Sequence, residues 1–181
     1  GDCTMPFYQG KGFRALELPF EENNMSMLFI LPVNGKFLNF EENFSTEVID
    51  TITSNLTPLY LHIAIPRFRI ESGYDLIKTL EQIGLILPFH QGADFSGIDG
   101  VDDGSPWVDL LVHKAEIEVN EYGVHAAAAT AMGMIIGSLP SFQAARPFIY
   151  LIRDRETGTI LFIGRAVDPD YSWWFIEPLP W

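Results

Sequence analysis

Apolar and polar residues alternate along several short stretches of this chain, and the alternation predicts a molecule built mainly from β-strands. In residues 13–20, apolar side chains surround the charged Arg14 and Glu17, a pattern typical of a strand. Residues 25–31 form a short apolar run that ends at Pro32, and the polar link between the two segments favours a hairpin. Further strands are predicted at residues 59–65, 67–71, 108–119 (long, with one buried face), 148–152 and 159–163, the last two as a C-terminal hairpin.

Two segments show the helical period instead. Residues 41–52 place four apolar side chains on one face, and residues 74–83 show the same spacing before Gly84, a residue type that commonly follows a helix. Residues 92–105 are rich in Gly and Asp and predict a solvated loop, whose adjacent aspartates fit a surface turn better than a catalytic pair. The pattern as a whole predicts an α+β fold, mainly antiparallel sheets with a few helices.

The segment after the strand at 108–119 fits neither pattern. Gly123 leads into four consecutive alanines at 126–129, and the chain then runs to Pro140 without charge or clean period. A loop of this length in a compact domain is usually functional or disordered. Alanine suits a helix or a flexible linker, but small side chains also allow a segment to enter a sheet, with Gly123 as a hinge. Composition alone leaves these alternatives open.

Length and net charge limit the kinds of protein that this sequence can encode. The 181 residues, 48% of them hydrophobic, are enough for one domain over 1–181. A formal charge of −13 disfavours a nucleic-acid partner or an anionic membrane surface, because both need clustered Lys and Arg. No apolar run reaches the roughly 18 residues of a membrane span, so we expect no membrane partner.

The sequence shows no pattern for ordinary enzyme chemistry. Cys3 is the only cysteine, which excludes an intrachain disulfide, and the four histidines lack short metal-ligand spacing. No serine lies in a Gly-x-Ser-x-Gly motif, and no phosphate-binding loop is present. We therefore expect no catalytic residue, no metal and no cofactor. Three glycosylation sequons, at Asn24, Asn43 and Asn55, favour secretion slightly, although no signal peptide is visible.

One stretch of sequence identifies a family. Residues 112–123, Val-His-Lys-Ala-Glu-Ile-Glu-Val-Asn-Glu-Tyr-Gly, closely resemble the strand and hinge that precede the reactive loop of serpins. Further resemblances follow in the family's order at 65–71, 74–76, 92–98, 146–148 and 164–169. The chain is therefore similar to the C-terminal half of a serpin from about residue 5 to 169. The resemblance implies a long exposed reactive loop at about 121–146. Beyond the matched region, residues 170–181 form an aromatic C-terminal extension of the sequence.

The resemblance also implies a function. In serpins a protease cleaves the loop as a suicide substrate, and the cleaved loop inserts as a strand into the main sheet. The family's loop length puts the scissile bond at Gly137 and Ser138, within a residue or two. Residues implied in subsite contacts are Met134, Ile135 and Ile136, and those implied in the hinge and insertion are Glu121, Gly123, Val124, Ala126, Ala127, Ala128, Ala129 and Thr130.

The loop composition narrows the target and leaves alternatives. No Lys or Arg lies between Gly123 and Ala145, so an elastase-, subtilisin- or chymotrypsin-like serine protease is expected, and a papain-like cysteine protease also fits. Val124 and His125 stand where inhibitory members have an acidic or polar pair. A non-inhibitory carrier or chaperone is therefore an alternative, and so is an inactive fragment whose main-sheet strands lack neighbours. We expect an extracellular protein that is monomeric when complete.

Overall fold

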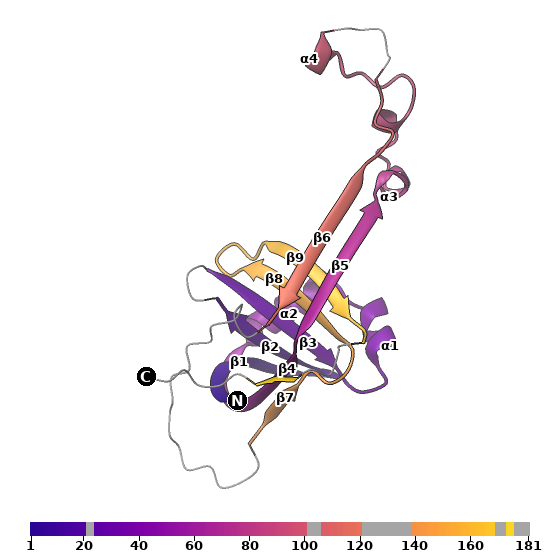
Figure 1. The fold of residues 1–181 in the computed structure, drawn as a ribbon. Coiled ribbons are helices and arrows are strands. Elements are labelled where there is room, and N and C mark those ends of the chain that lie inside the picture. Colours follow the sequence, from indigo (N-terminus) through magenta and orange to yellow (C-terminus); the bar gives the residue numbers. More distant parts are fainter. Residues whose placement is uncertain (21–23, 101–105, 121–138, 169–172, 176–181) are drawn as a thin grey trace. The chain divides into compact units, whose positions relative to one another are not determined.

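The computed structural model describes residues 1–20, 24–100, 106–120, 139–168 and 173–175. The chain divides into two compact units, one formed by Gly1–Phe68 with Glu118–Trp181 and the other by Arg69–Ile117. The first unit contains most of the strands and the helices α1 and α2, and the second contains the ribbon of β5 and β6 with short helices (Figure 1). This mostly β architecture with few helices confirms the predicted α+β class.

The first unit is one curved sheet. Its strand order is β10-β4-β1-β2-β3-β8-β9, and β7 also pairs with β4. All neighbours are antiparallel except β7 and β4, which are parallel. The strands are β1 (Asp2–Gly10), β2 (Phe13–Pro19), β3 (Met25–Pro32), β4 (Thr57–Pro66), β7 (Ser141–Gln143), β8 (Phe148–Asp154), β9 (Ile160–Ala166) and β10 (Trp173–Phe175).

The predicted hairpins of this unit are confirmed. β2 pairs with β3 with Leu16 opposite Phe29, and β8 pairs with β9 with Leu151 opposite Ile163. The strand prediction missed β1, β7 and β10. β1 contains a proline and no clear alternation, but it hydrogen-bonds to β2 on one side and to β4 on the other.

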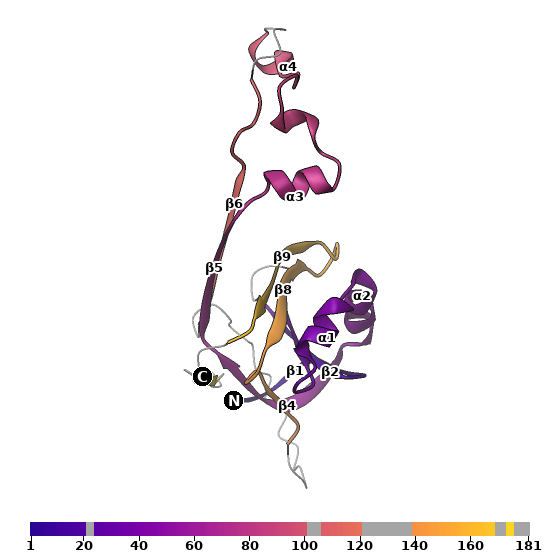
Figure 2. The ribbon, with the colours of Figure 1, turned by 90° about the vertical axis from the view of Figure 1, so that its right-hand side faces the viewer.

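Two helices lie on one face of the sheet where one was predicted (Figure 2). α1 (Phe37–Glu42) and α2 (Thr46–Asn55) are separated at Ser45, which has an extended backbone. The prediction of a single helix at 41–52 was therefore wrong near its start, because residues 43–45 separate the two helices. The predicted apolar face is nevertheless the buried one, because Ile49 and Ile52 pack in a core cluster with Leu28 and Ile149 of the sheet.

Aromatic rings fill another part of the core. Phe148 lies 5.8 Å from Phe29 and 5.6 Å from Phe68, measured between ring centroids, and Phe68 lies 5.4 Å from Tyr150. Phe29 and Phe148 are fully buried. Each of these rings removes a large apolar area from water, so this cluster contributes strongly to the stability of the first unit.

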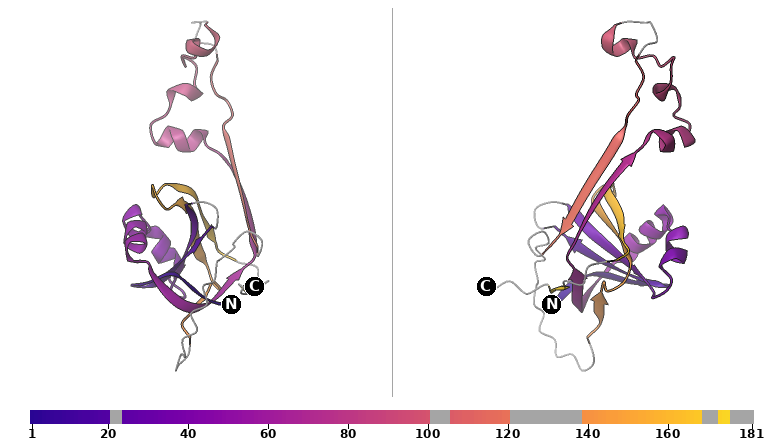
Figure 3. Two further views of the ribbon diagram at one scale, coloured as in Figure 1. Left: turned by 90° about the vertical axis from the view of Figure 1, so that its left-hand side faces the viewer. Right: turned by 45° about the vertical axis from the view of Figure 1, so that its right-hand side comes forward.

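The second unit is built around two strands. β5 (Phe68–Asp75) and β6 (Val112–Val119) form a sheet of their own, and both views of Figure 3 show them side by side. Three short helices lie between these strands in the chain: α3 (Ile77–Gln82), the 3-10 helix η1 (Leu87–Phe89) and α4 (Ser96–Asp99). α3 is shorter than the predicted helix at 74–83, and α4 lies inside the predicted loop at 92–105, of which 101–105 fall outside the described residues.

Candidate functional site

The predicted reactive centre falls outside the described residues. This applies to the whole of 121–138, and so to the hinge at Gly123, the insertion residues Glu121, Val124, Ala126, Ala127, Ala128, Ala129 and Thr130, the subsite residues Met134, Ile135 and Ile136, and the bond between Gly137 and Ser138. The two flanks of this segment are described. Their structure defines what the predicted loop is attached to at each end.

The N-terminal flank is β6. Its side chains at Ala115 and Ile117 are half-buried and Val119 is buried, while the other five are exposed. The predicted alternation is present and the predicted apolar face is the less exposed one, although only Val119 on it is buried and the strand begins at Val112 instead of residue 108. The pairing with β5 is supported by Arg69, whose Nη2 lies 2.8 Å from both Glu71 Oε1 and Glu116 Oε1.

The C-terminal flank lies in the main sheet. β7 runs parallel to β4 with Phe142 opposite Ile63, and Phe142 is fully buried. The backbone N–H of His62 donates to Pro140 O at 2.8 Å, and the N–H of Ala144 donates to Ala64 O at 2.9 Å. The last six residues of the predicted range 121–146 therefore include a strand whose central side chain belongs to the core.

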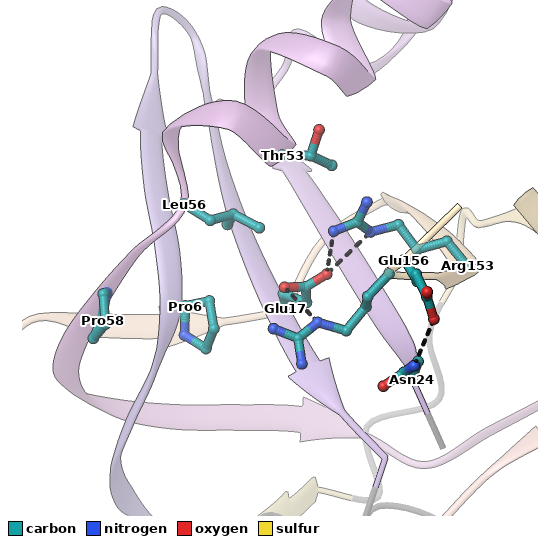
Figure 4. Close-up of a pocket in the computed structure, with 9 residues that line it drawn as sticks. Pro6, Glu17, Asn24, Thr53, Leu56, Pro58, Arg153 and Glu156 are labelled. Carbon is teal, nitrogen blue, oxygen red and sulfur yellow. Dashed lines mark hydrogen bonds and ion pairs between the residues drawn. The ribbon is translucent and has the colours of Figure 1, made fainter. Parts of the chain in front are cut away.

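A second candidate site lies between β2, β8 and α2. This pocket of about 580 Å³ is lined by Glu17, Arg153, Arg155, Asn24 and Thr53, together with Pro6, Leu56, Pro58 and Glu156 (Figure 4). The volume falls in the range of about 300 to 1,000 Å³ that is common for small-molecule sites. The strands bring together residues that are far apart in the sequence, because Glu17 and Arg153 are separated by 136 positions.

Glu17 organises the charges of this pocket. Its Oε1 accepts hydrogen bonds from Arg153 Nη2 at 2.8 Å, Arg153 Nε at 3.0 Å and Ser26 Oγ at 2.7 Å, and its Oε2 lies 3.8 Å from Arg155 Nε. Glu17 and Ser26 are buried. Arg155 is about half exposed, with a side-chain exposure of 45%. The pocket therefore has a compensated charge pair at its base and a second, accessible guanidinium.

Sequence reasoning missed this pocket. Glu17 fits a polar position in an alternating strand, yet its exposure is only 2%. A signal was present, because Glu17 lies between the apolar Leu16 and Leu18 in a strand that had to be buried on at least one side. The partner arginines could not be identified from the sequence, since their proximity depends on the order of β2, β3 and β8.

The three sequon asparagines are all exposed. Asn24 Nδ2 donates to Glu156 Oε2 at 3.0 Å, Asn43 Nδ2 donates to Asn39 O at 2.7 Å, and Asn55 Nδ2 donates to Thr51 O at 2.8 Å. Asn24 also lines the pocket around Glu17. Exposure of all three side chains is compatible with modification.

The remaining reactive groups form no catalytic cluster in the described ranges. Cys3 is buried, and burial raises the pKa of its thiol. His62 Nδ1 lies 2.7 Å from Asp2 Oδ1, and His90 Nε2 lies 2.7 Å from Glu81 Oε1. Among the described residues, no three His, Cys, Asp or Glu side chains are grouped to hold a metal ion. No helix in these ranges has the length and apolar character to cross a membrane.

Relatives of known sequence place the chain in a family. A family model described as Serpin (serine protease inhibitor) matches residues 2–169. The chain is 39% identical over 170 residues to an uncharacterised serpin-like protein of Thermococcus kodakarensis, covering 91% of this chain and 39% of that protein. It is 38% identical over 183 residues to human antithrombin-III, covering 92% and 39%, and 37% identical over 164 residues to a leukocyte elastase inhibitor of Xenopus laevis, covering 86% and 43%.

A solved structure agrees in fold. Thyroxine-binding globulin in complex with thyroxine matches with a TM-score of 0.79 and 27% identity, covering 93% of this chain and 45% of that one. The chain thus spans about two fifths of the length of the curated relatives it matches. The matched region includes the described flanks of the predicted loop and the pocket around Glu17. This chain belongs to the serpin family.

Proposed function

We propose that this protein inhibits a protease by the serpin mechanism. The observation that carries the proposal is the two-stranded sheet of β5 and β6. β6 ends at Val119, just before the predicted insertion segment, and in the described part of the chain β5 and β6 pair only with each other. Free strand edges accept a further extended segment through main-chain hydrogen bonds. The segment after β6 could therefore add to this two-stranded sheet as a further strand, because the sheet has an edge that no described strand occupies.

The opposite flank is suited to stay in place. β7 is hydrogen-bonded to β4, and Phe142 is packed in the core. Cleavage in the predicted loop would leave this end attached to the first unit and release only the residues on the N-terminal side. The two flanks thus favour a movement in which residues from Val124 to Thr130 join a sheet while β7 does not move.

The chemistry belongs to the target protease. Its serine oxygen attacks the carbonyl carbon of Gly137, the peptide bond to Ser138 breaks, and the new amine of Ser138 leaves with a proton. The product is an acyl-enzyme on the Gly137 carbonyl. Insertion of the released segment inhibits the protease if it is faster than hydrolysis of this ester.

The proposed target accepts small or apolar residues. Gly137 is at the cleaved position, and Met134, Ile135 and Ile136 precede it, with no basic residue between Gly123 and Ala145. A trypsin-like pocket needs a basic side chain to pair with its carboxylate. Elastase-, subtilisin- and chymotrypsin-like enzymes are therefore the proposed class, and a papain-like cysteine protease is the second choice. A leukocyte elastase inhibitor is among the relatives.

The full gene product should be incubated with elastase and with chymotrypsin. We expect a covalent complex that survives a denaturing gel, with cleavage mapped by mass spectrometry to within two residues of Gly137. Cleavage without a complex and without a rise in melting temperature would contradict inhibition. Ala128→Glu puts a charge in the inserting segment and should convert the protein into a substrate, because a buried unpaired charge is costly. Gln143→Glu, at an exposed position of β7, is the matched control and should inhibit normally.

A carrier function is the second candidate, and the pocket around Glu17 favours it. The pocket has an accessible guanidinium on Arg155, and the structural neighbour thyroxine-binding globulin was solved with thyroxine bound. A non-inhibitory carrier should bind an amphipathic anion here and gain no thermal stability on loop cleavage. Titration of the full gene product with thyroxine as the probe tests this. Binding that Arg155→Gln weakens, together with an unchanged melting temperature after cleavage, would favour the carrier.

We further propose an extracellular, monomeric protein. The support is the exposure of Asn24, Asn43 and Asn55, each in a sequon. Expression through a eukaryotic secretory pathway should add glycan mass that an endoglycosidase removes. Unmodified asparagines in the secreted product would remove this support, and light scattering of the full gene product decides between monomer and oligomer.

A further inference from the structure

A smaller pocket lies where β3 ends and α1 begins. It has a volume of about 330 Å³ and is lined mainly by the apolar side chains of Pro32, Val33, Phe37, Leu38 and Pro147, with Arg146 as its only charged residue. Val33 and Leu38 are exposed at 48% and 70%, although both are large apolar side chains. None of these residues belongs to the pocket around Glu17. The two pockets are therefore separate sites in the first unit.

Local structure fixes the guanidinium at this position. Arg146 Nε donates to Pro32 O at 2.8 Å, which ties the segment after β7 to the end of β3. Gly35 turns the chain towards α1 with a φ of 73°, a conformation that favours glycine. The prolines at 32 and 147 restrict the backbone on both sides. The pocket is thus formed before any ligand binds, which lowers the entropic cost of binding.

The charge of Arg146 is not compensated by the described protein. No carboxylate in the described ranges forms an ion pair with it, and its described hydrogen bond uses only Nε. Its Nη groups are therefore available to a ligand. The other partly buried arginine, Arg153, shows the contrast, because it is fully engaged with Glu17.

A second arginine adds to the positive potential. Arg14 bonds Gln9 Oε1 through Nε and Ser141 O through Nη1, and it too has no carboxylate partner in the described part of the chain. Burial lowers the pKa of Arg146, and the charge of Arg14 lowers it further. A guanidinium stays protonated at neutral pH in spite of such effects. An anion bound at Arg146 would relieve this repulsion.

We propose that the pocket of Pro32, Phe37, Leu38 and Arg146 binds a small amphipathic carboxylate. The carboxylate pairs with the Nη groups of Arg146, whose fork geometry matches it, and the apolar part of the ligand covers Val33, Phe37 and Leu38. An aromatic or medium-chain acid fits the volume, since sites for small molecules begin at about 300 Å³. The proposal uses no residue of the predicted insertion segment or scissile bond and is independent of the inhibitory function.

Calorimetric titration of the full gene product with 2-naphthoate tests the proposal, with 2-naphthalenemethanol as the uncharged probe of the same shape. We expect saturable binding of the acid with one site and weaker binding of the alcohol. Arg146→Gln should weaken binding of the acid at least about tenfold, because hydrogen bonds to charged groups are worth more than neutral ones. It should leave binding of the alcohol almost unchanged. Leu38→Ser, at an exposed position where little effect on stability is expected, should weaken binding of both probes.

Arg155→Gln is the matched control, because it removes a guanidinium from the other pocket. It should leave 2-naphthoate binding unchanged. The proposal would be overturned if wild type and Arg146→Gln bound the acid equally well while circular dichroism showed that both proteins are folded. Loss of binding in Arg155→Gln with retention in Arg146→Gln would overturn it as well, because the acid would then occupy the pocket around Glu17.

Discussion

The two units of this chain differ in how much apolar core they contain. The first unit has a large core, including Phe29, Phe142 and Phe148, which are fully buried, although its strand β9 also exposes apolar side chains such as Ile163. In the second unit large apolar side chains are exposed, among them Tyr74, Ile83, Leu87, Ile98 and Leu110. The first unit therefore has the packing that determines a unique structure. The second has strand pairing with few buried apolar side chains among its described residues, an arrangement that is only marginally stable by itself.

The same contrast holds for charges. The ion pair between Glu17 and Arg153 is almost completely removed from water, with side-chain exposures of 3% and 12%. Arg69 makes two ion pairs in the second unit, and all three side chains of that group are more than half exposed. Buried pairs are sensitive to loss of one partner, whereas exposed pairs contribute little. Matched substitutions in the two units can therefore test how far they differ.

The largest difference is expected for apolar truncation. Phe148→Ala removes a ring that contacts Phe29, Phe68 and Tyr150, and should reduce the free energy of unfolding by about 3 to 5 kcal/mol. Ile98→Ala, at a side chain that is 84% exposed, should change it by less than about 0.5 kcal/mol. Urea denaturation of the full gene product measures both. Similar losses would show that the second unit packs as tightly as the first in solution.

A somewhat smaller difference is expected for charge removal. Glu17→Gln leaves Arg153 buried without a carboxylate and should cost about 3 kcal/mol. Arg69→Gln breaks the exposed pairs with Glu71 and Glu116 and should cost about 0 to 1 kcal/mol. The same denaturation experiment, repeated at high salt, provides a control. Salt should reduce the effect at Arg69 and leave the effect at Glu17 nearly constant, because buried pairs are screened much less.

The sequence predicted those parts of the fold that depend on local pattern. The hairpins of β2 with β3 and β8 with β9 were found because alternating or apolar runs are joined by short polar links. The break between α1 and α2 was missed, although Asn43 and Ser45 are residue types that favour helix ends. β1 was missed because its conformation is set by pairing with β2 and β4, and the latter is about 50 residues away.

The candidate sites divide in the same way. The predicted loop was defined by a resemblance in sequence, and its central residues, 121–138, remain a prediction. The pocket around Glu17 and the one at Arg146 depend on contacts across 136 and 114 positions. Such contacts follow from sheet order, which periodicity does not determine. The apolar strand around Glu17 suggests that this glutamate is buried, but the sequence does not reveal which arginine pairs with it.

Replacing glycine by alanine should change the stability of the two units by a moderate amount. A Cβ added at Gly164 in β9 would lie 2.3 Å from the Tyr150 hydroxyl oxygen, and Tyr150 is buried. Gly164→Ala should therefore cost about 1 to 3 kcal/mol through overpacking. At Gly73 in β5 the nearest atom is Lys114 Cγ at 3.7 Å, so Gly73→Ala should be neutral or slightly stabilising. Melting temperatures of the two variants give the comparison, and a loss at Gly73 equal to that at Gly164 would contradict it.

The smallest effect on stability is expected for the carboxylates of Asp154 and Asp94. The backbone N–H of Thr157 donates to Asp154 Oδ1 at 2.7 Å in the turn between β8 and β9, and this bond, with those from the Thr157 hydroxyl and the Glu156 N–H, lowers the pKa of Asp154. In the second unit the hydroxyl of Ser96 donates to Asp94 Oδ1 at 2.6 Å and its N–H at 3.0 Å, which lowers the pKa of Asp94.

A lowered pKa in the folded state stabilises the protein above the unfolded pKa of about 3.9, and the contribution is lost as the pH falls through the folded pKa. Asp154→Asn should therefore lower the urea midpoint at about pH 6 and converge with wild type near pH 2, since the amide keeps an acceptor oxygen but no charge. Asp94→Asn should follow the same pH course with a smaller amplitude, because its turn joins no strands of the packed sheet. A difference for Asp154→Asn that persists at the lowest pH would mean that geometry, and not charge, makes this turn stable. An equal amplitude at Asp94 would mean that the second unit unfolds together with the first.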